Sequence, residues 1–399
     1  MKPNSRVLVF SVPVTLLLAC GSPVVTPPDT GAAQPPSSGT DAGDSQVASD
    51  AAGQLGMDLA IQSDAGVASG AGADSGALAD AGIAPEAGVD SGNQADTGSP
   101  TVLRMPWTLI ALPDTQYYSS SYPQIFDAQT NWIVSQVAAL NIRHVVHEGD
   151  IVDNSLDSQW TNASHSLHLL DRKVPYALAL GNHDYPGGGG AGSRDTTLFD
   201  GYFSLTSLDW ETSLGGIYEP GHVGNAYYAF EANGQSWLIV TLEFGPRDAV
   251  LAWADGILKA NPSANAIVVT HAYLYADGTR FDHLTRTDQA FNPHTYGVEA
   301  LAGGVNDGEE IWQKLIVNNA NVRIVLCGHV HAESHLTSTR AAGPPVHQIL
   351  ADYQDDGQGG NGYLRIMTFQ PNGVINVSSY SPYLKQYRTD GDNAFTLSL

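Results

Sequence analysis

Short apolar runs that end in polar residues recur along the chain from Trp107 onward. The first run spans residues 107–112 and the second is centred on 145–146, with apolar residues at near-helical spacing between them. Strands that alternate with helices build α/β layers. Open α/β sheets place their sites where the strands end. The pattern therefore predicts an α/β domain over residues 101–399 with its site at the polar strand ends.

Five polar blocks follow apolar runs in this way, and each offers carboxylate, amide or imidazole donors. Oxygen and nitrogen donors without a thiolate suit Mn, Fe, Zn, Co or Mg. One carboxylate between two groups of ligands can bridge a metal pair. The five blocks are Asp114-Thr115-Gln116, Gly149-Asp150-Ile151-Val152-Asp153, Gly181-Asn182-His183-Asp184, Thr270-His271 and Gly328-His329-Val330-His331.

Each block taken alone has a plainer interpretation. An aspartate after a strand, such as Asp114 or Asp150, is most often a turn residue or a helix cap. A lone histidine such as His271 is more often structural than a ligand. His329 and His331 are a stronger signal, because alternate side chains of an extended segment point to one side. Together, the five blocks indicate a metal site.

The order of the blocks resembles that of the calcineurin-like metallophosphoesterase family over roughly residues 105–380. The shared pattern is D-x-[H/Q], G-D-x-x-D, G-N-H-D, a lone His and G-H-x-H. The resemblance implies a four-layer α/β/β/α sandwich of two mixed sheets flanked by helices. It also implies that a metal-bound hydroxide at a dinuclear site cleaves a phosphate mono- or diester. The implied cofactors are two divalent or trivalent ions, with Mn, Fe, Zn and Co as candidates.

The same resemblance gives each polar residue a role. The ligands of the first metal would be Asp114, Gln116, Asp150 and His331. The ligands of the second would be Asp150, which bridges, with Asn182, His271 and His329. The catalytic residues would be Asp150, then His183 near the phosphoryl or leaving-group oxygen, and Asp184, which would orient His183.

Two positions depart from the family pattern. Gln116 stands where many members have His, and a neutral amide oxygen is a poorer ligand for a borderline metal. A weaker first site, a harder ion, or a water between Gln116 and the metal all stay open. Asp153 stands where purple acid phosphatases have a metal-binding Tyr, which disfavours that subtype. Gln116 also favours an alternative function, a non-catalytic metal-binding surface lipoprotein or adhesin that retains the fold.

Two segments between the blocks are candidates for substrate specificity. Residues 186–192 contain four consecutive glycines, which suit a mobile lid or an ordinary surface loop. Residues 272–307 follow His271 directly, so we expect them to fold over the metal centre. Candidate substrate contacts there, with surface charge and ring packing as the alternative, are Arg280, Arg286, His294 and Tyr296. Residues 307–310 predict the N-terminus of a helix.

The N-terminus resembles that of bacterial lipoproteins. Two basic residues precede an apolar run, Val7 to Ala19, that is too short to span a bilayer. Residues 17–20 resemble a lipobox, so we expect a signal peptide over 1–19 and lipidation of Cys20. Gly21 after this cysteine favours the outer membrane or cell surface. The alternative is an ordinary secretory signal with an incidental Cys.

Residues 21–100 contain eleven acidic residues and no Lys, Arg, Phe, Trp or Tyr. Such a stretch cannot bury enough apolar area to offset its ordering entropy, so 20–100 is predicted to be a disordered tether. An irregular spacing of acid-small-Gly triplets argues against a calcium-binding repeat. An adhesin in which this tether is the functional part is a further alternative.

The formal net charge is -24. A chain this acidic has no uniform basic field, which argues against polymeric nucleic acid as a partner. A phosphate-ester small molecule or a phosphorylated macromolecule is expected instead, with membrane contact only through the N-terminal lipid. The substrate, the choice between monoester and diester, the native metals and the oligomeric state stay open.

Overall fold

The computed structural model describes residues 104–205 and 213–399. The chain divides into two compact units, Met1–Gly92 and Asn93–Leu399, and only the second contains described residues. The predicted signal peptide 1–19, the lipidation site Cys20 and the tether 20–100 all lie outside the described residues. Within the described part, no helix is long and apolar enough to cross a membrane.

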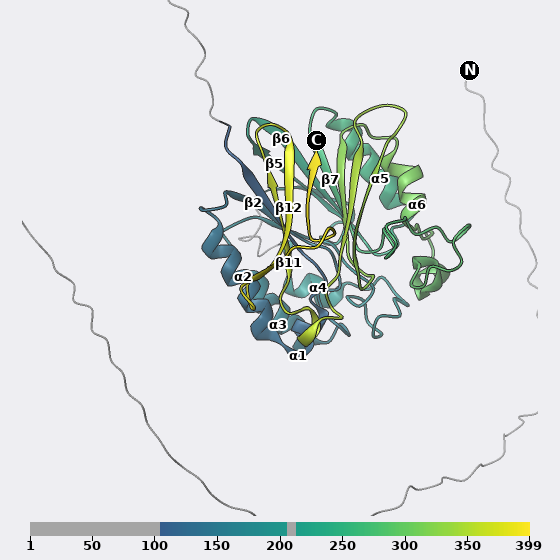
Figure 1. Cartoon of the computed structure of the whole chain (residues 1–399). Coiled ribbons are helices and arrows are strands. Elements are labelled where there is room, and N and C mark those ends of the chain that lie inside the picture. The colour runs from purple at the N-terminus through teal and green to yellow at the C-terminus, as the bar shows by residue number, and fades with distance from the viewer. Residues whose placement is uncertain (1–103, 206–212) are drawn as a thin grey trace, which may run out of the picture. The chain divides into compact units, whose positions relative to one another are not determined.

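One mixed sheet is built around β1 (Trp107–Leu112) (Figure 1). On one side β1 pairs in parallel with β2 (Ile142–His147), which pairs in parallel with β3 (Tyr176–Leu178). On the other side β1 pairs antiparallel with β11 (Leu364–Phe369). The antiparallel strands beyond β11 are β12 (Val374–Ser381) and its two partners, β13 (Gln386–Arg388) and β14 (Ala394–Ser398).

The second mixed sheet has the order β4-β5-β6-β7-β8-β10-β9. Its centre is parallel from β6 to β10, and its outer pairs are antiparallel. The strands are β4 (Leu214–Ile217), β5 (Ala226–Ala232), β6 (Gln235–Leu242), β7 (Asn265–Thr270), β8 (Val322–Cys327), β9 (Glu333–Ser338) and β10 (Val346–Ala351).

The inner faces of the two sheets pack against each other. Trp107 of β1 stacks on Phe369 of β11 at 3.9 Å between ring centroids. Its ring also meets Trp237 of β6, in the other sheet, edge-on at 5.0 Å. Alternate residues along β1 join this inner core, while Ile110 and Leu112 belong to a second core that includes helix residues. This period-two alternation is the pattern of a strand buried on both faces.

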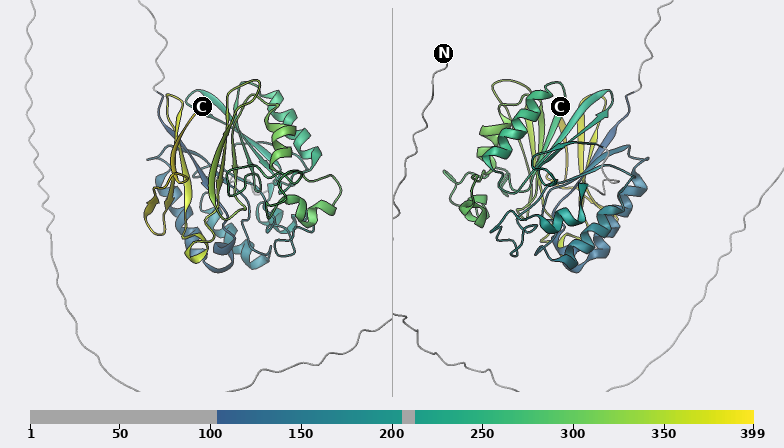
Figure 2. Two further views of the ribbon diagram at one scale, coloured as in Figure 1. Left: turned by 45° about the vertical axis from the view of Figure 1, so that its right-hand side comes forward. Right: turned by 180° about the vertical axis from the view of Figure 1, so that it is seen from behind.

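Helices form the two outer layers, which are separated clearly in Figures 1 and 2. The helices on the β2 side are α1 (Gln116–Ser121), α2 (Pro123–Gln136) and α3 (Asp157–His168), with α4 (Thr197–Tyr202) in contact with α3. Those on the β7 side are α5 (Asp248–Ala260), α6 (Gly308–Ile311) and η4 (Trp312–Ile316). The remaining short elements among the described residues are η2 (Pro293–Thr295), η3 (Gly297–Ala300) and α7 (Gly357–Gly360). The predicted four-layer sandwich is confirmed.

The apolar run 176–180 predicts a strand, but β3 ends two residues earlier, at Leu178. Its partner β2 ends at His147, so the ladder has no further residue to pair with. The predicted helix start at 307–310 is confirmed. The side chain of Asp307 accepts a hydrogen bond from the backbone N–H of Glu310, and the side chain of Glu310 accepts one from that of Asp307.

Candidate metal centre

The five polar blocks come together where parallel strands of both sheets end. Asp114 follows β1, Asp150 follows β2 and Asn182 follows β3, all in the first sheet. His271 and His329 follow β7 and β8 of the second sheet. Strands that point the same way bring their carboxyl ends to one edge, which explains why residues far apart in sequence meet here.

Asp150, His271 and His329 lie buried at the centre of this site, and one donor atom of each lies within 4.8 Å of the others. Nε2 of His271 lies 3.2 Å from Oδ2 of Asp150. Asp150 has φ 50°, the left-handed region in which aspartate is among the better tolerated residues. A Cβ on Gly181 would lie 2.0 Å from Oδ1 of Asp150, so only glycine fits beside this carboxylate.

One nitrogen of the His271 ring faces one nitrogen of the His329 ring. Nδ1 of His271 lies 3.0 Å from the carbonyl oxygen of Glu148, and Nε2 of His329 lies 2.8 Å from that of Phe291. Because carbonyl oxygens only accept hydrogen bonds, these outer nitrogens carry the hydrogens. In neutral rings the inner nitrogens, Nε2 of His271 and Nδ1 of His329, then hold lone pairs only 3.1 Å apart. Two facing lone pairs suit a bound cation.

The pKa values of the two aspartates beside the imidazoles, Asp114 and Asp150, shift in opposite directions. Burial, reinforced by Asp352 and Asp150, raises the pKa of Asp114 well above its ordinary value. Burial also acts to raise the pKa of Asp150, but the neighbouring His271 outweighs it and the net shift is downward. Burial, and then His271, lowers the pKa of His329 to about 3, so this ring is neutral at pH 7.

Two amide side chains offer free oxygens to the same site. Nδ2 of Asn182 donates to the carbonyl oxygen of Gly189 at 2.9 Å, and Nε2 of Gln116 donates to the side chain of Gln354. Oδ1 of Asn182 and Oε1 of Gln116 are buried and have no hydrogen-bond partner among the described residues. An unsatisfied buried polar atom costs about 1–3 kcal/mol. The donor set therefore fits metal ions, which would satisfy both oxygens.

His331 lies at the rim of the site and is more exposed than the other predicted ligands. Its Nδ1 is 2.7 Å from Oδ1 of Asp355, and its Nε2 contacts the side chain of Gln354. Gln354 thus touches both Gln116 and His331. Gln354 was not anticipated from the sequence, although it lies two residues after Asp352 and so in a polar block that directly follows the apolar run Val346–Ala351.

The carboxylate of Asp184 contacts backbone N–H groups. Its Oδ1 accepts from the backbone N–H of Val152 at 3.0 Å, and its Oδ2 accepts from that of Gly181 at 2.8 Å. Asp184 therefore ties the loops after β2 and β3 together. Among the described residues, Asp153 contacts the His183 ring instead: its carbonyl oxygen lies 2.5 Å, and its carboxylate 3.6 Å, from Nδ1.

The glycine-rich loop 186–192 packs against the site. Gly189 has φ 84°, and a Cβ there would come within 2.4 Å of the His183 ring. The same residue accepts the hydrogen bond from Asn182, and the carbonyl oxygen of Gly190 accepts one from the N–H of Gly297. The four glycines suggested either a mobile lid or an ordinary surface loop. In the structure, this loop packs closely around His183.

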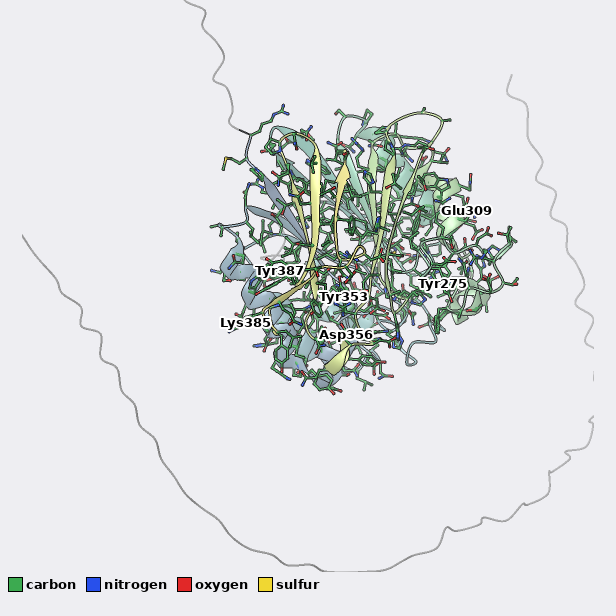
Figure 3. All side chains as sticks on the ribbon, in the orientation of Figure 1. Tyr275, Glu309, Tyr353, Asp356, Lys385 and Tyr387 are labelled. Carbon is green, nitrogen blue, oxygen red and sulfur yellow. The ribbon has the colours of Figure 1, made fainter. Side chains whose placement is uncertain are left out.

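A small cavity of about 110 Å³ opens over the metal centre. Beside the polar residues, three aromatic side chains line it, namely Tyr117, Phe291 and Tyr296. Of the four candidate substrate contacts in 272–307, Tyr296 lines this cavity. Arg280 pairs with Glu309, labelled in Figure 3, and Arg286 pairs with Asp277 and Asp288. His294 belongs to a separate cluster described below.

Two buried acids beside the centre were not anticipated. Both carboxylate oxygens of Glu148 and Oδ2 of Asp352 have no hydrogen-bond partner among the described residues. Burial raises the pKa of Glu148, and it raises that of Asp352 to about 7. Asp352 directly follows the apolar run Val346–Ala351, so the rule that found the five blocks would also have found this residue.

A family profile and a relative of known sequence match this chain. The profile described as calcineurin-like phosphoesterase matches residues 108–333. A relative from Bacillus subtilis (strain 168), the uncharacterized protein YvnB, is 37% identical over 312 residues. The match covers 73% of this chain but only 22% of YvnB, so the chain spans less than a quarter of that relative's length.

Two solved structures were also compared. A purple acid phosphatase from yellow lupin (Lupinus luteus) has a TM-score of 0.46 and 15% identity, covering 74% of this chain and 54% of its own. A dimetal phosphatase from Danio rerio has a TM-score of 0.41 and 13% identity, covering 74% of this chain and 98% of its own.

Proposed function

The chain belongs to the calcineurin-like phosphoesterase family, and from this premise we propose that it hydrolyses phosphate mono- or diesters with bound metal ions. One observation carries the proposal: two buried imidazoles from different strands face each other at 3.1 Å, beside a carboxylate. A purely structural pair of buried histidines would gain nothing from two opposed lone pairs. A pair that binds a cation requires them.

We propose that the centre holds two ions. Around the bridging carboxylate of Asp150, the ligands of one ion would be Asp114, Gln116 and His331, and those of the other would be Asn182, His271 and His329. When bound, such a pair polarises phosphoryl oxygens and lowers the pKa of a coordinated water toward neutrality. Oxygen and nitrogen donors without a thiolate favour Mn, Fe, Zn or Co.

The protein's own groups would position the phosphoryl group. The cavity of about 110 Å³ is smaller than sites for drug-sized ligands, which run about 300–1,000 Å³. It therefore suits a phosphoryl group, with the remainder of the ester outside. Tyr117, Phe291 and Tyr296 would exclude water from one side of that group and contact the leaving group.

His183 would assist the leaving group. Because Nδ1 of this ring donates to the carbonyl oxygen of Asp153, Nε2 is the nitrogen left for the substrate. His183 lines the cavity, and its backbone N–H donates to Oδ1 of Asp150 at 2.9 Å. The ring can therefore hydrogen-bond to a phosphoryl or leaving-group oxygen while its backbone braces Asp150.

A panel of aryl phosphate mono- and diesters, assayed with Mn, Zn, Fe, Co and Mg, tests the proposal. The expected result is turnover with at least one metal and its loss in EDTA. Asp150→Asn should reduce turnover by orders of magnitude, since asparagine keeps the shape and tolerates the left-handed backbone but cannot bridge two cations. Asp127→Asn, on α2, is the matched control. Near-normal turnover in Asp150→Asn contradicts the proposal.

The second candidate is a surface protein that keeps the metal centre without turnover, which the amide ligand Gln116 favours. Stable metal binding by a chain that cleaves none of the panel would support this candidate. Loss of both binding and turnover in Asp150→Asn would support the hydrolase.

We further propose export and attachment to the outer membrane or cell surface through acylated Cys20. The support is the basic start, the apolar run Val7 to Ala19 and the lipobox-like residues 17–20. Cells fed a labelled fatty acid should label the chain, and Cys20→Ala should abolish the label. Labelling that persists in Cys20→Ala would refute lipidation at this residue.

A further inference from the structure

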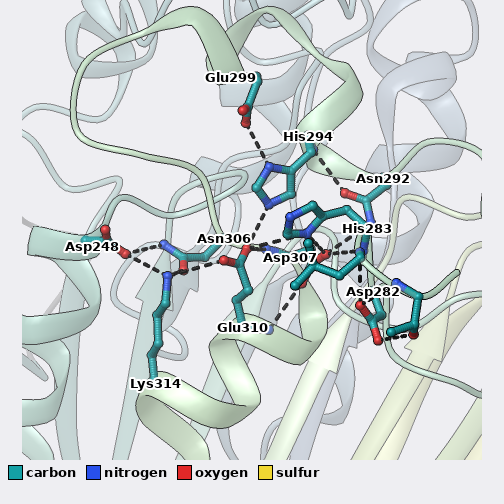
Figure 4. Close-up of polar contacts among 12 residues, drawn as sticks. Asp248, Asp282, His283, Asn292, His294, Glu299, Asn306, Asp307, Glu310 and Lys314 are labelled. Carbon is teal, nitrogen blue, oxygen red and sulfur yellow. Dashed lines mark hydrogen bonds and ion pairs between the residues drawn. The ribbon is translucent and has the colours of Figure 1, made fainter. Parts of the chain in front are cut away.

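A second group of metal-ligating side chains lies in the loop after β7 and at the start of α6. We call it the loop cluster, and it consists of His283, His294, Asp307 and Glu310 (Figure 4). One donor atom of each residue lies within 4.8 Å of the others. None of the four belongs to the metal centre or lines its cavity.

Two imidazoles and two carboxylates are paired face to face in the loop cluster. The rings of His283 and His294 stack at 3.6 Å between centroids and 26° between planes. Nδ1 of His283 lies 2.9 Å from Oδ2 of Asp307, and Nε2 of His294 lies 2.7 Å from Oε2 of Glu310. Each ring thus faces one of the two carboxylates, and Nδ1 of His283 also lies 4.0 Å from Oε2 of Glu310.

The two carboxylates are fixed in place by their other oxygens. Oδ1 of Asp307 accepts from the backbone N–H of Glu310 at 3.1 Å, which caps α6. Oε1 of Glu310 is 3.3 Å from Nζ of Lys314. The other oxygens, Oδ2 of Asp307 and Oε2 of Glu310, face the imidazoles, and each also accepts a backbone hydrogen bond, from the N–H of His283 and of Asp307 respectively. Such preorganisation lowers the ordering entropy that a bound ion would otherwise cost.

His294 has a carboxylate at each ring nitrogen, since Nδ1 lies 2.8 Å from Oε2 of Glu299. Without an ion, this arrangement needs both nitrogens protonated. Histidine ligands of metals characteristically donate their second N–H to a carboxylate, as His294 does to Glu299. The loop cluster therefore already has the outer contact of a metal-binding histidine.

We propose that the loop cluster binds one divalent cation of the zinc type, separately from the metal centre. Four donors, two nitrogen and two oxygen, match the four-coordinate preference of Zn²⁺. A site with four protein ligands leaves no open position, so its role is structural.

The ion would stabilise the loop that closes over the metal centre. Nδ2 of Asn292 donates to Oδ2 of Asp307 at 3.2 Å. The preceding residue, Phe291, has φ 66° and accepts the hydrogen bond from Nε2 of His329. The loop cluster thus holds Asn292 in place, and the neighbouring Phe291 orients His329, a predicted metal ligand.

The test uses the full chain, stripped with EDTA and reloaded with Zn²⁺ or Co²⁺. Asp150→Asn/His271→Ala, which disables the metal centre, should still bind one Zn²⁺ per chain and show the visible absorption of four-coordinate Co²⁺. Adding His283→Ala should remove that ion and its absorption. This readout needs no turnover, so it stands whether or not the chain is a hydrolase.

Two further variants guard against a folding defect. Glu299→Gln keeps the loop cluster's four ligands and should weaken Zn²⁺ binding about 10–100-fold. His222→Ala removes an exposed histidine that pairs with Asp200, and it should leave the affinity unchanged. No Zn²⁺ bound by the variant with the disabled centre, or equal affinity in Glu299→Gln and wild type, overturns the proposal.

Discussion

Nε2 of His271 and Nδ1 of His329 lie 3.1 Å apart, although the residues follow different strands. Each ring is held by a backbone carbonyl on its far side, that of Glu148 for His271 and that of Phe291 for His329. The orientation of both rings is therefore fixed by hydrogen bonds to the main chain.

His329→Asn should remove one bound metal ion and lower turnover at least ~100-fold, because the developing charge loses several kcal/mol of stabilisation. Asparagine tolerates the left-handed backbone at this position, φ 77°, so the fold should survive. Elemental analysis and a phosphatase assay measure both effects. His335→Asn, on β9, is the control, and full metal content in His329→Asn would contradict the assignment.

Gly189→Ala should lower kcat about 100-fold with metal content preserved, because the new methyl group displaces the His183 ring. Gly187→Ala is a matched control: it too has a left-handed backbone, φ 112°, but nothing lies within 4 Å of an added Cβ. Circular dichroism checks folding, and steady-state kinetics separate kcat from KM. Equal kinetics in the two variants would show that His183 does not depend on this contact.

Gln354→Ala should weaken binding of the first metal about 10–100-fold, because Gln354 touches both Gln116 and His331 without being assigned as a ligand. At saturating metal, kcat should stay within a few-fold of wild type. Turnover measured over a range of Mn²⁺ concentrations gives the change in metal affinity. Gln313→Ala, on the surface of η4, serves as the reference, and an unchanged Mn²⁺ dependence in Gln354→Ala would refute this role.

Burial of His144 should make the free energy of unfolding depend on pH, independently of the metals. Burial lowers the pKa of this β2 residue to about 4, from an ordinary value of 6.5. Between those values the unfolded chain binds the proton and the folded chain does not, so stability falls as pH drops from 6.5 to 4.

The corresponding loss in the free energy of unfolding is about 3 kcal/mol. His144→Gln should lack this part of the slope, since glutamine does not titrate. Urea unfolding of both proteins at pH 7, 5.5 and 4 measures the difference in their free energies of unfolding. The contributions of the other histidines are the same in both proteins and cancel in this difference. Parallel pH profiles for wild type and variant would contradict the prediction.

The fold and the family were predictable because strand ends carry local signals. The profile match over 108–333 confirms the family that the five blocks indicated. Asp114, Asp150 and His271 each follow an apolar run, and each lies at the end of its strand. Burial of a continuous apolar run is a strong local signal, and topology then brings the ends together.

The partners of the site residues were not predictable in the same way. Whether His183 contacts Asp153 or Asp184 depends on the path of the loops after β2 and β3, which no local pattern encodes. Gln354 reaches Gln116 only through the fold. Strand β12, which pairs with β11 on one side and with β13 and β14 on the other, was missed because its residues alternate between buried and partly exposed positions, a weaker signal than a fully apolar run.

The pairing of β1 with β11 sets the order in which the molecule can assemble. Trp107 and Phe369 are register partners, so the first strand of the domain acquires its antiparallel neighbour only from the last quarter of the chain. Such non-local pairing slows folding and leaves an open strand edge that can recruit another chain. A product shortened just after residue 333 would keep every assigned metal ligand and yet be expected to aggregate, with Trp107 unstacked from Phe369.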